Sequence, residues 1–180
     1  MKRIVNTNRF GSIEVQDQHI IHFKDGMVGF VQLKDYFIVE SSSLPLLLWL
    51  QSVDNPAIAF PVVEPAFFQR DYKAVPTEAD KARLELEVGE ATKQFVVMTI
   101  PEDMTKMTVN MKAPVVVNLE KGLGSQMILQ DKNLLVRKPA HEAFNKAVAS
   151  LSLDHDDIDV ESEEDFNWSP VDYKGVSQVG

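Results

Sequence analysis

The residues of this chain that could do chemistry are few and lie far apart in the sequence. Asp54 and Asn55 sit side by side in a polar stretch, SVDNP, between the apolar runs LLLWL (46–50) and AIAFPVV (57–63). A carboxylate there could act as a general acid or base, and an amide could hold a ligand. Asp followed by Asn and Pro is also common turn chemistry. Since no nearby residue could serve as a catalytic partner, we interpret Asp54-Asn55-Pro56 as a turn that exposes the Asn55 amide for recognition.

The other polar candidates do not form a catalytic or metal-binding pattern. His19 and His22 are three residues apart in a predicted strand, so alternation points them to opposite faces. His155 lies among acidic residues, where weak metal binding is conceivable. The chain has no cysteine and no G-x-S-x-G, Walker A or G-x-G-x-x-G motif. The sequence therefore predicts no enzyme, no metal site and no cofactor; a hydrolase using Asp54 or Asp71 would lack a positioned base.

Adjacent aromatic residues mark a second candidate region. In PAFFQRDY (65–72), Phe67 and Phe68 are neighbours, so an extended chain would turn one of them away from the core. An exposed aromatic side chain can anchor a protein interface, although both rings could equally be buried in an irregular loop. The predicted partner-binding residues are Gln51, Asp54, Asn55, Phe67, Phe68 and Asp71.

The charge of the chain is concentrated near its C-terminus. The net charge is −9, yet residues 154–165 (DHDDIDVESEED) hold eight acidic residues and no Lys or Arg. Without them, 19 acidic residues face 18 basic ones. A nearly neutral body argues against direct nucleic-acid binding, which needs a basic face. An acidic run of this kind is commonly solvated and flexible, but it could also steer the protein toward a basic partner.

Composition also bears on localisation. No run reaches about 18 uncharged apolar residues, so we expect no transmembrane helix. The start MKRIVNTNRF lacks the apolar region of a secretory signal, and the absence of cysteine suits the cytoplasm. We therefore expect a cytoplasmic protein that does not contact membranes and is a monomer when free.

Alternation with a period of two is the dominant pattern and predicts β-strands. It appears at 11–16 (GSIEVQ), 83–88 (RLELEV) and 106–112 (KMTVNMK). Other short runs are apolar on both faces and indicate buried strands, namely 37–40, 46–50, 95–100 and 115–117. Turn residues separate these runs, and no long helical crossover intervenes. This favours a mostly β fold: an antiparallel barrel-like sheet with short connecting helices.

Two helices complete the prediction. PTEADKARL (76–84) fits a short helix starting near Pro76 and Thr77. In HEAFNKAVASL (141–151), Phe144, Ala147, Val148 and Leu151 share one apolar face. We therefore divide the chain into a β-barrel domain (1–138), a C-terminal amphipathic helix (139–152) and an acidic, flexible tail (153–180).

Four stretches in the same order together resemble the FliW family of flagellar assembly factors. IIHFKDGMVGF (20–30) is similar to an opening strand followed by a G-x-x-G-F turn. LQSVDNPAIAFPVVEPAFFQRDY (50–72) resembles the L-Q-S … F-x-V-x-x-P-x-x-F-x-x-D-Y block. TIPEDMTKMTVNMKAPVVVN (99–118) and GSQMILQDKNLLVR (124–137) are similar to the T-x-N-L-x-A-P-I-V-I-N segment and to the closing Q-x-I-L … R. The turn Gly26-Met27-Val28-Gly29-Phe30 lacks the proline of the family's G-L-P-G-F, and Met111 replaces a usual Leu.

The resemblance implies a partner switch rather than a reaction. FliW proteins are small cytoplasmic barrel-like proteins that bind flagellin before its export and also bind the translational regulator CsrA. CsrA represses flagellin messenger RNA, so flagellin that captures FliW releases CsrA to repress translation. The alternative from the residues alone is a β-barrel that binds a small ligand. The resemblance covers residues 3 to 138 and leaves the C-terminal segment without a counterpart.

Overall fold

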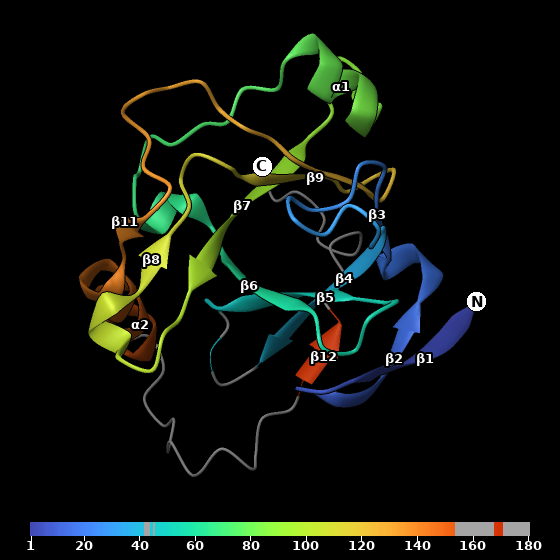
Figure 1. Cartoon of the computed structure of the whole chain (residues 1–180), viewed down its shortest axis with the longest axis horizontal. Helices are drawn as coiled ribbons and strands as arrows, with labels where there is room; N and C mark the ends of the chain where they lie inside the picture. Colours follow the sequence, from blue (N-terminus) through green and yellow to red (C-terminus); the bar gives the residue numbers. More distant parts are fainter. Residues whose placement is uncertain (42–43, 45, 154–167, 171–180) are drawn as a thin grey trace.

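The computed structural model describes residues 1–41, 44, 46–153 and 168–170, and its central feature is a closed barrel (Figure 1). Seven strands follow one another in the order β7-β6-β5-β4-β3-β10-β9, and β9 pairs again with β7. Their bounds are Ile21–Phe23 (β3), Asp35–Ser41 (β4), Leu48–Ser52 (β5), Ala59–Val63 (β6), Thr92–Thr99 (β7), Val115–Asn118 (β9) and Leu123–Gln126 (β10). The predicted mostly β, barrel-like fold is confirmed.

One parallel pair closes the barrel between segments that are distant in the sequence. β10 runs parallel to β3, with Leu123 opposite His22 and Gly124 opposite Phe23, whereas the other barrel pairs are antiparallel. Gly124 is required there because a Cβ atom would lie 2.5 Å from the Phe23 ring. The expected antiparallel sheet therefore contains one parallel junction, between β3 and β10.

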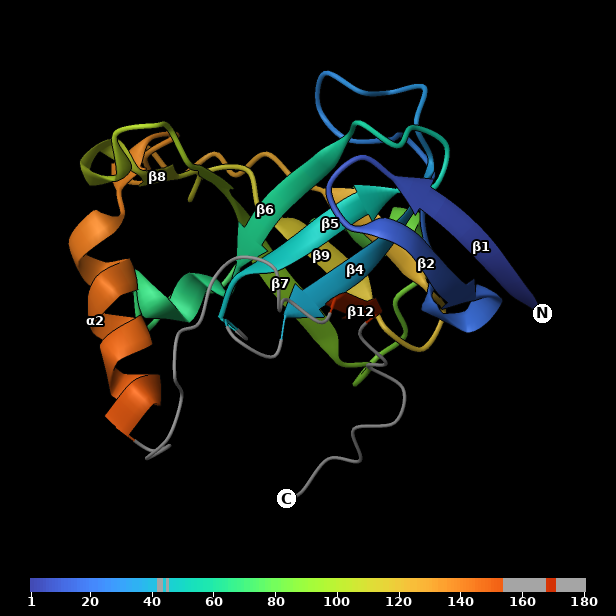
Figure 2. The same cartoon turned by 90° about the horizontal axis from the view of Figure 1, so that it is seen from below.

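The runs that are apolar on both faces are buried on both faces. In β4, Tyr36 and Ile38 point into the barrel core, while Phe37 and Val39 join a second cluster outside it. That outer cluster contains Trp49 and is covered by a hairpin of β1 (Lys2–Thr7) and β2 (Gly11–Gln16), seen beside the barrel in Figure 2. Alternating side chains thus pack into two different apolar clusters, one on each face of the strand. This explains why these strands have no polar face.

A third apolar cluster joins the barrel to the C-terminal helix. α2 (His141–Leu153) places Phe144 against Val63, Met98 and Met107. The same side of the barrel carries η2 (Pro65–Phe67), η3 (Met104–Lys106), β8 (Thr108–Val109) and β11 (Lys138–Pro139). The end of β7 pairs with β8, and β8 pairs with β11. The helix predicted over 141–151 is confirmed, and Leu151 at its end is 40% exposed.

The short helix α1 (Glu78–Leu84) corrects one predicted strand. The Thr77 side chain accepts a hydrogen bond from the Asp80 backbone N–H, and the Asp80 side chain accepts one from the Thr77 N–H, as in a capping box. The predicted strand at 83–88 is wrong because Leu84 ends this helix and Glu85 adopts a left-handed conformation with φ 50°. Alternation of Leu84, Leu86 and Val88 resembled a strand without forming one.

The C-terminal part is described only in segments. β12 (Trp168–Pro170) pairs antiparallel with β4, with Ser169 opposite Glu40. The acidic run at 154–165 lies outside the described residues, so its flexibility and its steering role stay predictions, as does the division of the chain at residue 138. Among the described helices, none is both long enough and apolar enough to cross a membrane.

Candidate functional site

The polar stretch between β5 and β6 forms a tightly hydrogen-bonded turn, as predicted for Asp54-Asn55-Pro56. The Ser52 hydroxyl accepts hydrogen bonds from the backbone N–H groups of Asp54 (3.2 Å) and Asn55 (3.1 Å). The Asn55 side-chain oxygen accepts one from the Ala57 N–H at 3.0 Å, and Ile58 N–H donates to the Asn55 carbonyl at 3.1 Å. The amide oxygen of Asn55 is therefore committed to the turn, while its NH₂ group makes no hydrogen bond with another described residue.

Gln51 holds this turn from inside. Its side chain is fully buried, and its Nε2 group donates to the carbonyl oxygens of Ser52 (2.9 Å), Asn55 (3.3 Å) and Ile58 (3.0 Å). Its Oε1 atom is buried without a hydrogen-bond partner among the described residues. A buried amide oxygen that accepts no hydrogen bond lowers the stability of the folded protein. Gln51 is thus a structural residue with one remaining acceptor.

The tip of the β1–β2 hairpin completes a polar hollow beside the turn. Asn8 N–H donates to the Pro56 carbonyl at 2.9 Å, which fixes the hairpin on the turn. A hollow of about 360 Å³ lies between Asn8, Arg9, Gln51 and Pro56. The Arg9 guanidinium stacks over the Trp49 ring, 4.2 Å from its centroid. Arg9 could donate a hydrogen bond to a polar group of a partner at this hollow, whereas Gln51 Oε1 is buried beneath it.

Asp54 is exposed at the surface of the turn and has one electrostatic effect inward. Burial raises the pKa of Tyr36 to about 12, with a smaller contribution from the negative charge of Asp54. The Tyr36 hydroxyl is buried without a partner in the described part of the chain. Among the described residues, the Asp54 carboxylate has no hydrogen bond or ion pair that would give it a proton-transfer partner.

The second group of predicted residues lies at the other end of β6. Phe67, in η2, is 42% exposed, whereas Phe68 is partly buried against the cluster that contains Phe144. Asp71 is exposed. Since β6 alone spans about 13 Å from end to end, Phe67, Phe68 and Asp71 do not form one site with Gln51, Asp54 and Asn55. Figure 1 shows the β5–β6 turn on the side of the β1–β2 hairpin and α2 on the opposite side.

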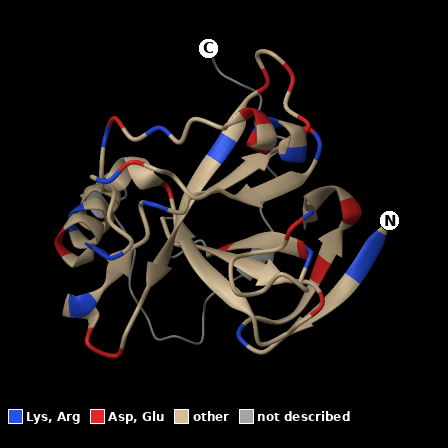
Figure 3. Ribbon diagram, turned by 45° about the horizontal axis from the view of Figure 1, so that its top comes forward, with Lys and Arg blue, Asp and Glu red and all other residues tan. Residues whose placement is uncertain are grey.

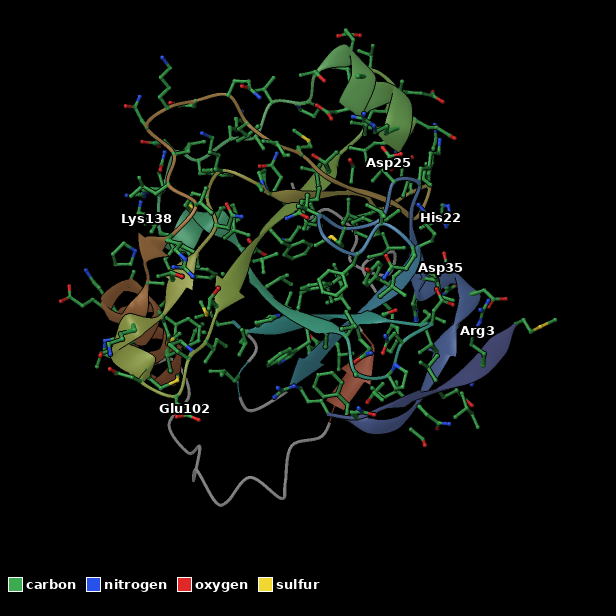
Figure 4. The ribbon with its side chains drawn as sticks, in the orientation of Figure 1. Arg3, His22, Asp25, Asp35, Glu102 and Lys138 are labelled. Atoms are coloured by element: carbon green, nitrogen blue, oxygen red, sulfur yellow. The ribbon has the colours of Figure 1, made fainter. Side chains whose placement is uncertain are left out.

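Backbone-anchoring side chains fix the η2 region. The Tyr72 hydroxyl donates to the Met111 carbonyl at 2.8 Å, and burial raises the pKa of Tyr72 to about 12. Lys138 Nζ donates to the Phe68 carbonyl at 3.0 Å, and Figure 4 shows its side chain among these segments. Phe67 is therefore an exposed ring on a fixed support, which suits the anchoring role predicted for it.

Charged residues of both signs are interspersed along the described part of the chain (Figure 3). Many lie beside an opposite charge, as Lys24 Nζ does beside Glu85 Oε1 at 2.7 Å. His22 Nδ1 lies 2.7 Å from Asp35 Oδ1, and both residues are labelled in Figure 4. Arg83 joins Asp25 and Asp80 beside a hollow of about 360 Å³ under α1. No cluster of three or more His, Cys, Asp or Glu residues suited to a metal occurs in the described part of the chain.

The shifted carboxylates have structural causes. Burial works to raise the pKa of Asp80, but hydrogen bonds from the Thr77 side chain and backbone and from Arg83 outweigh it, so the pKa is lowered. A hydrogen bond from the Glu87 backbone N–H lowers the pKa of Glu90, and Lys24 lowers that of Glu85. A general acid working near neutral pH needs a raised pKa. Asp80, Glu85 and Glu90, whose pKa values are lowered, therefore fit roles in helix capping and ion pairing better than the role of a general acid.

Sequence patterns did not reveal that Asn8, Arg9 and Trp49 lie beside the turn. Their meeting depends on the hairpin folding over β4 and β5, and residues some 40 positions apart give no local signal of such a contact. A cation over an indole can be recognised only once both are placed.

Comparisons with known proteins agree with this architecture. A model of the FliW protein family matches residues 3–140. A flagellar assembly factor FliW of Bdellovibrio bacteriovorus is 42% identical over 145 residues, which cover 81% of this chain and 83% of that protein. One from Caldanaerobacter subterraneus is 37% identical, covering 79% and 96%. The crystal structure of a flagellar assembly factor FliW superposes with a TM-score of 0.69 at 26% identity, covering 76% of this chain and 96% of that one.

Proposed function

Because the chain belongs to the FliW family of flagellar assembly factors, we propose that it binds flagellin in the cytoplasm and antagonises CsrA. When flagellin is scarce, the protein holds CsrA and flagellin translation proceeds. When flagellin accumulates, it occupies the protein, and CsrA is released to repress its messenger RNA. The observation that carries this proposal is the match to the family over residues 3–140, which includes all seven strands of the barrel.

The geometry supports action by binding and not by catalysis. The barrel interior is filled by large side chains that are at most 1% exposed, including Phe23, Tyr36, Leu50 and Phe95. A filled barrel favours recognition at its surface over a small ligand held inside, which was the alternative from the sequence. The acidic groups with lowered pKa values cap helices and pair with lysine or arginine, so they support the fold.

Calorimetry on the purified full-length protein tests the proposal. We expect a 1:1 complex with the cognate flagellin monomer, a separate complex with CsrA, and loss of CsrA from that complex when flagellin is added. Exclusion of one partner by the other requires overlapping or coupled sites. The absence of binding to both flagellin and CsrA would overturn the proposal. Binding of both at once, with unchanged affinities, would overturn the partner switch alone.

A further inference from the structure

A groove with an apolar floor opens between two loops at the barrel surface. It has a volume of about 240 Å³. Val28, from the loop between β3 and β4, and Val136, just before β11, line its rim. Met27, Phe60 and Val97 line it too and pack into or against the barrel core, so they form an apolar floor, while Thr99, Asn110 and Gln126 add polar groups to the lining.

The loop that carries Val28 is fixed by its backbone. Gly26 and Gly29 have φ values of 72° and 83°, and Phe30 N–H donates to the Met27 carbonyl at 2.8 Å. A Cβ atom on Gly26 would lie 2.7 Å from the Val31 Cα atom, so only glycine allows this tight turn. The loop presents Val28 with little conformational freedom left to lose.

Side chains from the barrel fix the same loop from below. Val28 N–H donates to Gln126 Oε1 at 2.9 Å, and Gln126 Nε2 donates to the Ala113 carbonyl at 3.2 Å. The Phe30 ring meets the Phe60 ring edge to face, with centroids 5.1 Å apart. The loop therefore stays in place although its tip points to solvent.

The opposite rim is anchored just as firmly. Met111 N–H donates to the Leu135 carbonyl at 3.0 Å, one residue before Val136. Two residues after it, Lys138 pairs with Val109 in the ladder between β11 and β8. Val136 is thus held between two backbone attachments to the barrel.

Both rim valines are exposed on this firm support. Val28 is 59% exposed and Val136 is 57% exposed. Scattered exposed aliphatic side chains are normal on protein surfaces. These two differ because segments far apart in the sequence bring them to one hollow with an apolar floor. Such a hollow suits an apolar side chain of a partner, which would be buried against core residues.

Arg137 gives the groove a charge. It lines the same hollow, is exposed, and makes no ion pair or hydrogen bond with another described residue through its side chain. Its neighbour Lys138 is by contrast bonded to the Phe68 carbonyl. The groove lining contains no Asp or Glu. A carboxylate on a partner would therefore meet an unpaired guanidinium without a competing acid.

We infer that this groove is the docking site for flagellin, and that it takes an apolar flagellin segment with a carboxylate placed to reach Arg137. The inference rests on the proposed function and adds the surface that performs it. Charge complementarity at Arg137 and the apolar floor select this kind of segment over a basic or wholly polar one.

Aspartate substitutions on the rim test the inference. Val28→Asp and Val136→Asp place a carboxylate against the apolar floor and beside the incoming acidic group. We expect each to weaken binding of the purified cognate flagellin about ten-fold or more by calorimetry, as for an interface anchor. Val75→Asp and Val88→Asp are matched controls, because these valines are 71% and 108% exposed and do not line the groove. Both should bind flagellin like the unmodified protein.

Arg137→Glu tests the charge. It should weaken binding and flatten or reverse the dependence of affinity on salt concentration, whereas Lys146→Glu, at an exposed lysine on α2, should do neither. Thermal unfolding of every variant checks that the fold persists. Val28→Ser and Val136→Ser serve as milder replacements if an aspartate variant unfolds.

The outcomes distinguish failure of the groove inference from failure of the proposed function. If the unmodified protein binds flagellin and the groove variants bind it equally well, the groove inference fails and the proposed function stands. If the groove variants lose CsrA and keep flagellin, the occupant is wrong. If the unmodified protein binds no flagellin, the proposed function fails and the inference with it. Selective loss in the groove variants alone supports both.

Discussion

The β5–β6 turn and the groove between Val28 and Val136 use their side chains in opposite ways. The turn carries the conspicuous polar residues, but the side chains of Ser52, Gln51 and Asn55 form hydrogen bonds with backbone groups of the turn itself. The groove is lined by ordinary residues, yet its two valines are exposed and its arginine is unpaired among the described residues. A conspicuous polar stretch in a sequence can thus be used for hydrogen bonds within the protein, while the residues free to bind a partner lie elsewhere.

The largest effect that the comparison predicts is a loss of stability at the turn. Gln51→Ala removes a buried donor to three carbonyl groups and leaves a small cavity. We expect the free energy of unfolding in urea to fall by about 3 kcal/mol. Gln130→Ala, at an exposed position, should leave it unchanged. A Gln51→Ala protein as stable as the unmodified one would mean that the turn does not depend on this side chain.

The two adjacent phenylalanines should differ in how much each contributes to stability, because one is packed and the other is exposed. Phe68→Ala removes packing against the cluster around Phe144 and should cost about 2 kcal/mol of stability. Phe67→Ala should change stability by less than about 0.5 kcal/mol, because its ring is largely at the surface. Chemical denaturation of both variants measures the difference. Equal losses would show that Phe67 is packed and unavailable to a partner.

Asn55 distinguishes turn chemistry from recognition. Asn55→Ala loses the hydrogen bond to the Ala57 N–H and should cost about 1 kcal/mol of stability. Asn55→Asp keeps an acceptor at the same position and should recover most of that stability, while removing the NH₂ group. Flagellin titrations of both proteins complete the test. Weaker binding by Asn55→Asp with stability intact would make Asn55 a contact residue as well as a turn residue.

The smallest predicted effect is electrostatic. Because the folded pKa of Tyr36 is raised to about 12 from 10, its contribution to stability is complete below pH 10 and is lost as pH rises toward 12. Asp54→Asn removes the minor cause of this shift and should lower the Tyr36 pKa slightly. Ultraviolet titration of tyrosinate, with Tyr36→Phe to identify the signal, measures it. An unchanged titration would show that Asp54 is screened from the ring.

Sequence patterns predicted the local parts of this fold well. Alternation identified β2 at its observed bounds, and the apolar runs around Asp54 gave the β5–β6 hairpin. Helical spacing identified α2 through Phe144, which is buried as expected. These features depend on neighbours in the chain, so a short window contains the information that determines them.

The failures arose where a neighbouring helix cap or a distant segment decides the structure. Residues 83–88 alternate like a strand, but the capping box at Thr77 and Asp80 commits their start to α1. The glycines of the GMVGF turn indicated a bend without indicating what it displays. Val28 and Val136 are far apart in the sequence and share a groove only in the closed barrel. Such a closure depends on long-range contacts that no local pattern contains.

The most direct test compares the two regions in one experiment. Flagellin affinity by calorimetry and free energy of unfolding by urea denaturation are measured for Val28→Asp and Asn55→Ala beside the unmodified protein. We expect Val28→Asp to lose about ten-fold in affinity at unchanged stability, and Asn55→Ala to lose about 1 kcal/mol of stability at nearly unchanged affinity. The opposite pattern, with affinity lost at the turn and retained in the groove, would contradict this expectation.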